Sequence, residues 1–180
     1  MGSEHSADPQ LTAQLKTAIR AATTQLFANA ENYYYLSVST TEEGHPPVFS
    51  AWSREALDAA ANSPDAADVP VEWLKWSYSD SPYFNFGESH FEALQAAWLA
   101  RGSIDDFDDE EWNRELAVRV DTIEQALREL SDEGLFGKGV ERDRIVIVAE
   151  MVPPDRANTE RTIRLNPAEA LTQWLSEAAE

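Results

Sequence analysis

The chain has 180 residues, no cysteine, and 33 acidic against 14 basic side chains, which gives a formal net charge of −19. Its length suits one domain, and the absence of cysteine excludes thiolate catalysis, disulfide bridges and Cys-ligated zinc. A surface this acidic repels phosphate backbones and anionic lipids, so nucleic acid and membranes are poor direct partners, whereas encounter with a basic protein is accelerated.

The chain carries no sign of export or of a membrane span. Its N-terminus lacks the basic and then apolar order of a signal peptide, and no apolar run approaches the roughly 20 residues that cross a bilayer. We therefore expect a cytoplasmic protein. Residues 1–7 are expected to form a disordered tail, and residues 8–180 a single domain.

The first elements are a helix and a strand. Asp8 and Pro9 form a helix start, and leucine and isoleucine residues follow at helical spacing to about Asn29. The run Tyr33 to Thr40 is rich in aromatic and β-branched residues and alternates, which predicts a strand.

A second strand and a short helix come next. Val48 to Trp52 reads as a strand after a Gly-Pro turn. Ser53 is placed to cap a helix over residues 54–61, and residues 62–70 form a surface loop.

The segment Val71 to Phe91 is the most aromatic part of the chain. Pro82 and Gly87 prevent it from forming one helix, and the alternation within Leu74 to Tyr78 predicts a third strand. Aromatic side chains at this density form either a core layer or a recognition surface, because each ring combines a large apolar area with a directional edge or polar tip.

Two helices follow the aromatic segment. The first runs from Glu88 and stops before Gly102. The second is preceded by the acidic block of residues 105–111, whose charges complement a helix N-terminus, and is closed by Gly134 as its C-cap. Its apolar residues recur at three- and four-residue steps and are Trp112, Leu116, Val120, Ile123, Leu127 and Leu130.

The last part contains the clearest buried strand, Arg144 to Val152. We expect the long helix to pack its apolar face against residues 145–148 of this strand. Thr162 to Leu165 is a candidate for a further strand, and Asn166-Pro167 forms a capping signal for the last helix. These elements predict an α+β domain with an antiparallel or mixed sheet of about four to six strands, packed against long helices.

Three chemical motifs fail on spacing or composition. The acidic block lacks the central glycine and the spaced oxygen ligands of a calcium loop. His90 and Glu92 form an H-x-E pattern, but the deaminase motif also needs a cysteine pair. The glycines around Lys138 lack the Lys-Ser/Thr pair of a phosphate-binding loop. The sequence therefore predicts no catalytic residue, no metal and no cofactor.

The order of these elements, with YYYLSVST after the first helix, DEGLFG before RIVIVAEMV and RLNP before the last helix, resembles the bacterial family named domain of unknown function 4303. The resemblance spans roughly Leu11 to Leu175, and its most specific part is the W-S-x-x-D-S-P-Y run from Trp76 to Tyr83. The family has no established reaction. The resemblance implies a small acidic protein of the kind encoded beside secreted polymorphic toxins.

The first functional hypothesis is an immunity or antitoxin-like protein that neutralises a basic toxin domain by binding it. Carboxylates would match cationic groups on the partner, and those aromatic rings that are exposed would serve as anchors. The expected partner-binding residues are Trp73, Asp80, Tyr83, Phe84, Phe86, Asp105, Asp106, Asp108, Asp109, Glu110 and Glu111.

Other hypotheses remain open. One is an enzyme or small-ligand binder with a pocket under the aromatic loop over residues 73–91, in which Asp80 and Glu88 are the polar groups. Another is an acidic mimic of nucleic acid, which would need carboxylates in two regular rows.

Overall fold

The fold is a mixed β-sheet covered by helices on both faces. The computed structural model describes residues 7–64, 70–154 and 156–179. The strands are β1 (Tyr33–Thr41), β2 (Val48–Ser53) and β3 (Val146–Val152). The helices are α1 (Pro9–Phe27), α2 (Arg54–Ala61), α3 (Val71–Leu74), α4 (Glu92–Leu99), α5 (Asp109–Asp132), α6 (Arg156–Leu165) and α7 (Ala168–Glu177). Short 3-10 turns are η2 (Glu88–Phe91), η3 (Ile104–Asp106) and η4 (Gly139–Arg144).

The sheet has the strand order β2-β1-β3. Strands β1 and β2 are antiparallel, and β1 pairs in parallel with β3, so that Tyr35 lies opposite Val146. The predicted α+β class is therefore confirmed, with a mixed sheet. The expected four to six strands are not confirmed, since the described residues form three.

Two of the expected strands are not strands. Leu74 ends α3, and turn hydrogen bonds follow it, such as that from the Ser77 amide to the Leu74 carbonyl. Residues 162–165 belong to α6, where Arg161, Thr162 and Leu165 are buried at the spacing of one helix face. The expected cap at Asn166 is also wrong, because its side chain bonds both the amide and the carbonyl of Ile147 at the edge of β3.

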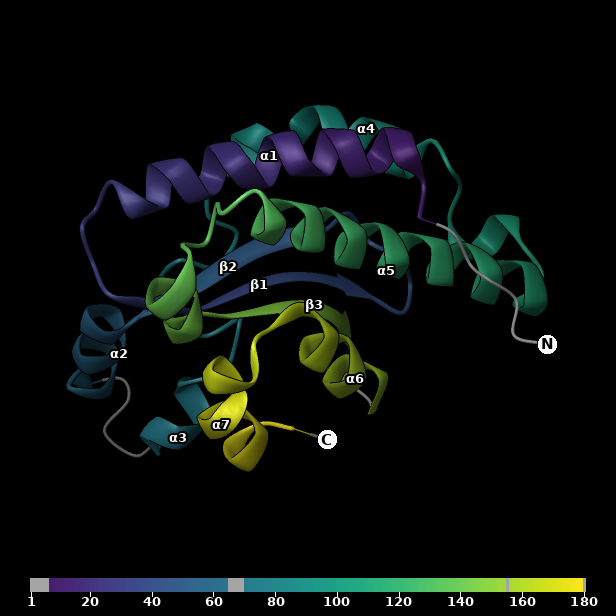
Figure 1. Cartoon of the computed structure of the whole chain (residues 1–180). Helices are drawn as coiled ribbons and strands as arrows, with labels where there is room; N and C mark the ends of the chain where they lie inside the picture. The colour runs from purple at the N-terminus through teal and green to yellow at the C-terminus, as the bar shows by residue number, and fades with distance from the viewer. Residues whose placement is uncertain (1–6, 65–69, 155, 180) are drawn as a thin grey trace.

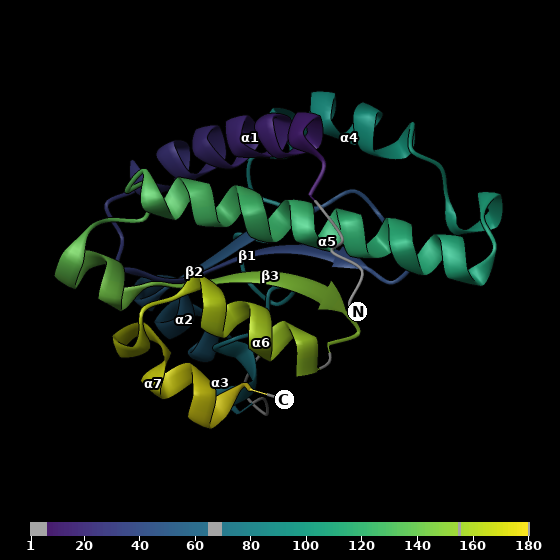
Figure 2. The same cartoon turned by 45° about the vertical axis from the view of Figure 1, so that its right-hand side comes forward.

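The helices form a layer on each side of the sheet (Figures 1 and 2). Helices α1, α4 and α5 cover one face, and α2, α3 and α7 lie on the other. Helix α6 lies beside the β3 edge, where its Asn158 and Arg161 side chains bond the strand's backbone. Within the described residues, none of the helices has the length and apolar character needed to span a bilayer. The tail expected over residues 1–7 lies, except for Ala7, outside the described residues.

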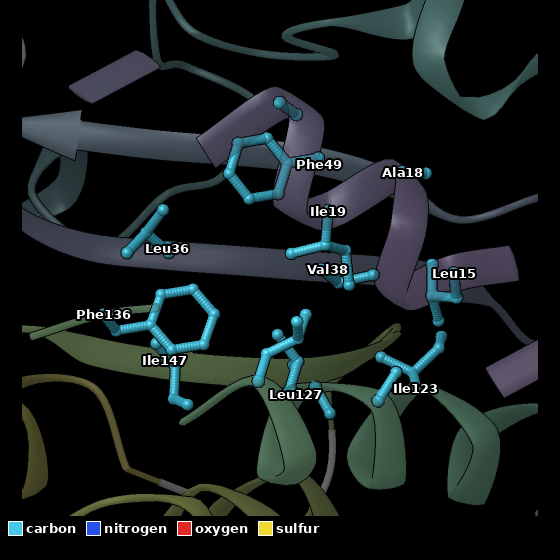
Figure 3. Close-up of a cluster of buried hydrophobic side chains, with 14 of the residues drawn as sticks. Leu15, Ala18, Ile19, Leu36, Val38, Phe49, Ile123, Leu127, Phe136 and Ile147 are labelled. Carbon is cyan, nitrogen blue, oxygen red and sulfur yellow. The ribbon is translucent and has the colours of Figure 1, made fainter. Parts of the chain in front are cut away.

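The larger core lies between the sheet and the long helices (Figure 3). Leu127 of α5 and Ile19 of α1 point toward Val38 and Ile147 on the sheet. The expected packing of the long helix against this segment is thus confirmed for Ile145 and Ile147, which share a core cluster with Leu127. It is wrong for Val146 and Val148, which belong to the cluster on the opposite face, because side chains alternate along a strand.

Helix α5 ends at Asp132, and Gly134 closes it as the sequence predicted. Gly134 has a φ of +86°, its amide bonds the Ser131 carbonyl, and the Leu135 amide bonds the Leu130 carbonyl. This is the hydrogen-bond pattern of the Schellman motif.

Replacing Gly134 by alanine is expected to lower the free energy of unfolding by about 1–2 kcal/mol, because a residue with a Cβ is strained at this φ. The added Cβ would also lie 2.3 Å from Cε of Lys138. Gly139→Ala is the matched control, since Gly139 has a φ of +54° but a Cβ added there would meet no atom within 4 Å. The Lys138 side chain can move aside, so the difference between the variants should come mainly from the backbone, since a φ of +86° lies further than +54° from the left-handed region that alanine tolerates. Urea unfolding should therefore show the larger loss for Gly134→Ala, and equal losses would contradict the greater backbone strain at Gly134.

Candidate functional site

A pocket of about 390 Å³ opens beside the first residues of the aromatic segment. Helix α3, the face of the sheet and helices α6 and α7 surround it. Its aromatic walls are Tyr35, Trp73, Trp76 and Trp174, and its carboxylates are Glu72, Glu150 and Glu177. We call it the tryptophan pocket.

Side chains of the sheet hold the pocket's inner wall in place. The hydroxyl of Tyr34 donates to the carbonyl of Lys75 at 2.7 Å, and Nε1 of Trp52 donates to the carbonyl of Ser77 at 2.7 Å. Trp76 stands between Lys75 and Ser77 in the sequence, and its ring packs edge-on against the ring of Tyr34, with 5.4 Å between the ring centroids. These contacts fix residues 75–77 on the sheet without a strand ladder.

Glu177 accepts three hydrogen bonds at the rim of the pocket. Nζ of Lys75 donates to Oε2 at 2.7 Å, Nε1 of Trp76 donates to Oε2 at 2.8 Å, and Gln173 donates to Oε1 at 2.9 Å. The bonds from Lys75 and Trp76 lower the pKa of Glu177 to about 2. The carboxylate is therefore ionised and fixed in position at neutral pH.

The floor of the pocket is formed by the sheet. Tyr35 is buried, and its hydroxyl donates to Oε2 of Glu150 at 3.3 Å, while Oγ of Ser37 donates to the same oxygen at 3.1 Å. Burial, and next the charge of Glu150, raise the pKa of Tyr35 well above its ordinary value. The phenol therefore stays neutral, and the pocket combines neutral aromatic walls with carboxylates. Such a lining suits a cationic or amphipathic group.

Replacing Glu177 by glutamine is expected to destabilise the protein at neutral pH but much less in acid. A carboxyl whose pKa falls from 4.5 in the unfolded chain to about 2 in the folded protein adds stability above pH 4.5, and this stability is lost as the pH falls toward 2. Urea unfolding of wild type and variant at pH 7 and pH 3 measures this, with the difference in stability at pH 3 at most about half that at pH 7. A difference independent of pH would contradict the stabilised charge.

The W-S-x-x-D-S-P-Y run attaches the aromatic segment to β2. Oγ of Ser81 donates to the carbonyl of Ala51, and the hydroxyl of Tyr83 donates to Oε1 of Glu31 at 2.8 Å. Further along, the amide of Phe86 donates to the carbonyl of Phe49 at 2.9 Å. These bonds assign a structural role to the motif's Ser81 and Tyr83.

Asp80 and Glu88 do not share a pocket. Asp80 lines a second hollow of about 630 Å³ between α2 and the aromatic segment, together with Glu31 and Glu55. Glu88 begins η2 and lines neither this hollow nor the tryptophan pocket. The paired role expected for these two acids has no geometric basis in the structure.

The four candidate aromatic anchors differ in exposure. Trp73 is 74% exposed and Phe84 is 47% exposed. Tyr83 and Phe86 are partly buried against the core, with their rings 5.7 Å apart. The aromatic segment therefore contributes to both core and surface, and Trp73 and Phe84 are its accessible rings.

All the carboxylates of the acidic block are exposed, and we call residues 104–111 the acidic tip. The side chain of Asp106 accepts bonds from the Ser103 amide and hydroxyl, and Asp108 forms a capping box with Glu111 at the start of α5. Asp105, Asp109 and Glu110 are also exposed. Across the described residues, no ion pair involves a carboxylate of this tip.

The structure does not bring the acidic tip and Trp73 together. In Figures 1 and 2 the start of α5 lies at one end of the molecule, away from α3 and α7. Sequence reasoning also missed the pocket residues Tyr35, Trp174 and Glu177. Trp174 and Glu177 stand three residues apart, which places them on one helix face, but this spacing does not reveal that the face borders a pocket.

The fold and the site define an acidic α+β protein with a three-strand mixed sheet and an aromatic, carboxylate-bearing pocket. Residues 15–167 match the family described as "Domain of unknown function (DUF4303)", so the chain belongs to this family. The match includes the W-S-x-x-D-S-P-Y run. No curated protein and no solved structure matched the chain.

Proposed function

We propose that the protein is a non-catalytic binding protein that neutralises a basic protein domain, such as a secreted toxin domain, in the way of an immunity protein or antitoxin. The formal net charge of −19 supports a basic partner, because opposite charges accelerate encounter. The absence of cysteine fits complex formation in the reducing bacterial cytoplasm.

The observation that carries the proposal is the exposed acidic tip. Its carboxylates form no ion pair with the described part of the chain, so their charge is available to cations of a partner. The exposed apolar side chain of Leu99 lies shortly before the tip in the sequence, and the exposed Ile104 is the tip's first residue. Apolar contact area next to charge is typical of protein interfaces, in which charge steers encounter and apolar anchors slow dissociation.

The exposed rings of Trp73 and Phe84 support the same proposal. Tryptophan is enriched among the residues that dominate interface energies, and a solvent-exposed indole loses a large apolar area from water on binding. The alternative function, a small-ligand binder or an enzyme, is supported by the tryptophan pocket, whose 390 Å³ suits a small molecule.

The experiment that tests the proposal is reconstitution with the partner. A basic domain captured from the native host should be purified separately and mixed with this protein. We expect a complex on size-exclusion chromatography that weakens as salt rises, and loss of the partner's activity at equimolar concentrations. The protein alone should bind neither DNA nor RNA at physiological salt. Substrate turnover by the protein alone would contradict the proposal.

A further inference from the structure

The tryptophan pocket combines the two components that bind organic cations, aromatic faces and carboxylates. Its rings come from three separate parts of the chain, with Trp73 and Trp76 at α3 and just after it, Tyr35 on β1, and Trp174 on α7. A cation placed over such rings is attracted by their negative faces, and the attraction increases as water is removed. The pocket is therefore suited to a positively charged group with an apolar stem.

One wall of this pocket already holds an ammonium group of the protein itself. Nζ of Lys75 lies 5.3 Å from the centroid of the Trp76 ring and 2.7 Å from Oε2 of Glu177, and its side chain is only 11% exposed. The lysine does not line the cavity. Its placement shows that the wall formed by Trp76 and Glu177 accommodates a largely buried cation.

Lys75 pairs with Glu177 and does not neutralise Glu72, another carboxylate of the pocket. Among the described residues that line it, three are carboxylates, Glu72, Glu150 and Glu177, and none is lysine or arginine. Glu72 is exposed beside Trp73, and within the described chain no basic group forms an ion pair with it. A further cation entering between Trp73 and Trp174 would thus meet the negative charge of Glu72.

We propose that the tryptophan pocket binds one cationic side chain, an arginine or a lysine, of the basic partner. The inference rests on the proposed function and names the site and the group that it recognises. The side chain inserts its apolar stem between Trp73 and Trp174 and brings its charge to Glu72. Exposed Trp73 then becomes buried under the partner, as expected for an interface anchor.

The test uses tripeptide amides added to the isolated protein. The cationic probes are acetyl-Gly-Arg-Gly-amide and acetyl-Gly-Lys-Gly-amide, and the neutral probes replace arginine by citrulline and lysine by norleucine. Binding is followed by NMR on the Nε1–H signals of the six tryptophans. Trp98 and Trp112 serve as internal controls, because their Nε1 atoms bond the carbonyls of Gly44 and Glu42, which do not line the pocket.

We expect the cationic peptides to shift the signals of Trp73, Trp76 and Trp174, and the neutral peptides to bind at least about fivefold more weakly. Trp73→Ala should weaken the binding of the cationic peptides by about 2- to 30-fold. Phe84→Ala, which removes an exposed ring outside the pocket, should leave them unchanged. Glu72→Gln should weaken binding and Glu88→Gln should not.

Equal binding of charged and neutral peptides, or no binding of either, would overturn the inference. Much tighter binding of n-butylamine than of the lysine peptide would also overturn it, in favour of a free amine as the occupant. The test does not require the partner. If the peptides do not bind but the protein forms a stable complex with its basic partner, only the inference about the pocket is rejected. If the peptides bind but no complex with a basic partner forms, only the proposed function is rejected.

Discussion

Replacing Arg119 by methionine is expected to lower the free energy of unfolding by about 3–5 kcal/mol. The side chain of Arg119 is 1% exposed, and its guanidinium donates to Oε1 of Glu115 at 2.8 Å. It also donates to the carbonyls of Gly44 and Gly102, both at 2.7 Å. Removing it breaks three charge-assisted hydrogen bonds and takes this donor from the Gly102 carbonyl, although Trp98 still donates to the Gly44 carbonyl and Arg101 to Glu115. The loss of these bonds exceeds the apolar contact that methionine restores.

Arg114→Met is the matched control for this variant. Arg114 is an exposed arginine of the same helix whose Nε donates to the Glu110 carbonyl at 3.3 Å, so its loss should change stability by less than about 0.5 kcal/mol. Urea unfolding monitored by far-UV circular dichroism measures both. A loss below about 1 kcal/mol for Arg119→Met would contradict the role assigned to its buried bonds.

Arg119 also connects the core to the acidic tip. Its bond to the Gly102 carbonyl holds the chain just before η3, and Glu115 is shared with Arg101, which pairs in turn with Asp8 at the start of α1. Burial alone would raise the pKa of Glu115, but the bonds from Arg101 and Arg119 lower it overall. The tip thus projects from an ionic network and has a defined position.

Long periodic segments of the sequence predicted their structure correctly. The apolar steps of residues 112–130 and the Gly134 cap define α5, and the β-branched run before Pro153 defines β3. In these segments local propensity and tertiary packing favour the same structure. Asp8 likewise caps α1 as expected, since its side chain accepts from the amides of Gln10 and Leu11.

The segment Leu74 to Tyr78 was predicted wrongly, because five residues of alternation do not by themselves distinguish a strand from a turn. Trp76 and Tyr78 alternate with polar residues, but the ring of Trp76 packs against Tyr34 and Tyr35, on strand β1 far earlier in the chain. Asn166 looked like a cap because the sequence does not show that the edge of β3 passes beside it. Both errors arise from contacts distant in sequence.

The candidate site was predictable only in part. The aromatic density of residues 73–86 indicated Trp73 and Phe84, and the charge density indicated the acidic tip. The tryptophan pocket was not predictable, because it forms where α3, β1, β3 and α7 meet, and this meeting depends on the parallel pairing of β1 with β3. Which of the aromatic side chains are exposed likewise depends on tertiary packing.

Changing Asp105, Asp106, Asp108 and Asp109 to asparagine is expected to slow association with the basic partner by about tenfold or more at low salt. Exposed charges act mainly on encounter, so the association rate should also depend less steeply on ionic strength. The variant should fold, because asparagine caps helices as well as aspartate does. The Asp108 side chain accepts from the Glu111 amide at 2.8 Å, and an amide oxygen can replace this acceptor.

The control removes the same charge elsewhere on the surface, by changing four exposed glutamates to glutamine, namely Glu88, Glu92, Glu141 and Glu169. Stopped-flow association at several salt concentrations compares the two variants. If the tip guides encounter, the tip variant is the slower one, whereas equal rates would assign the steering to the overall charge and contradict a specific role of the tip.

Trp73→Ala should have the opposite signature, with faster dissociation and unchanged association, because an apolar anchor acts after encounter. Steering by the tip and anchoring at the tryptophan pocket can therefore be separated kinetically, although both act on one complex.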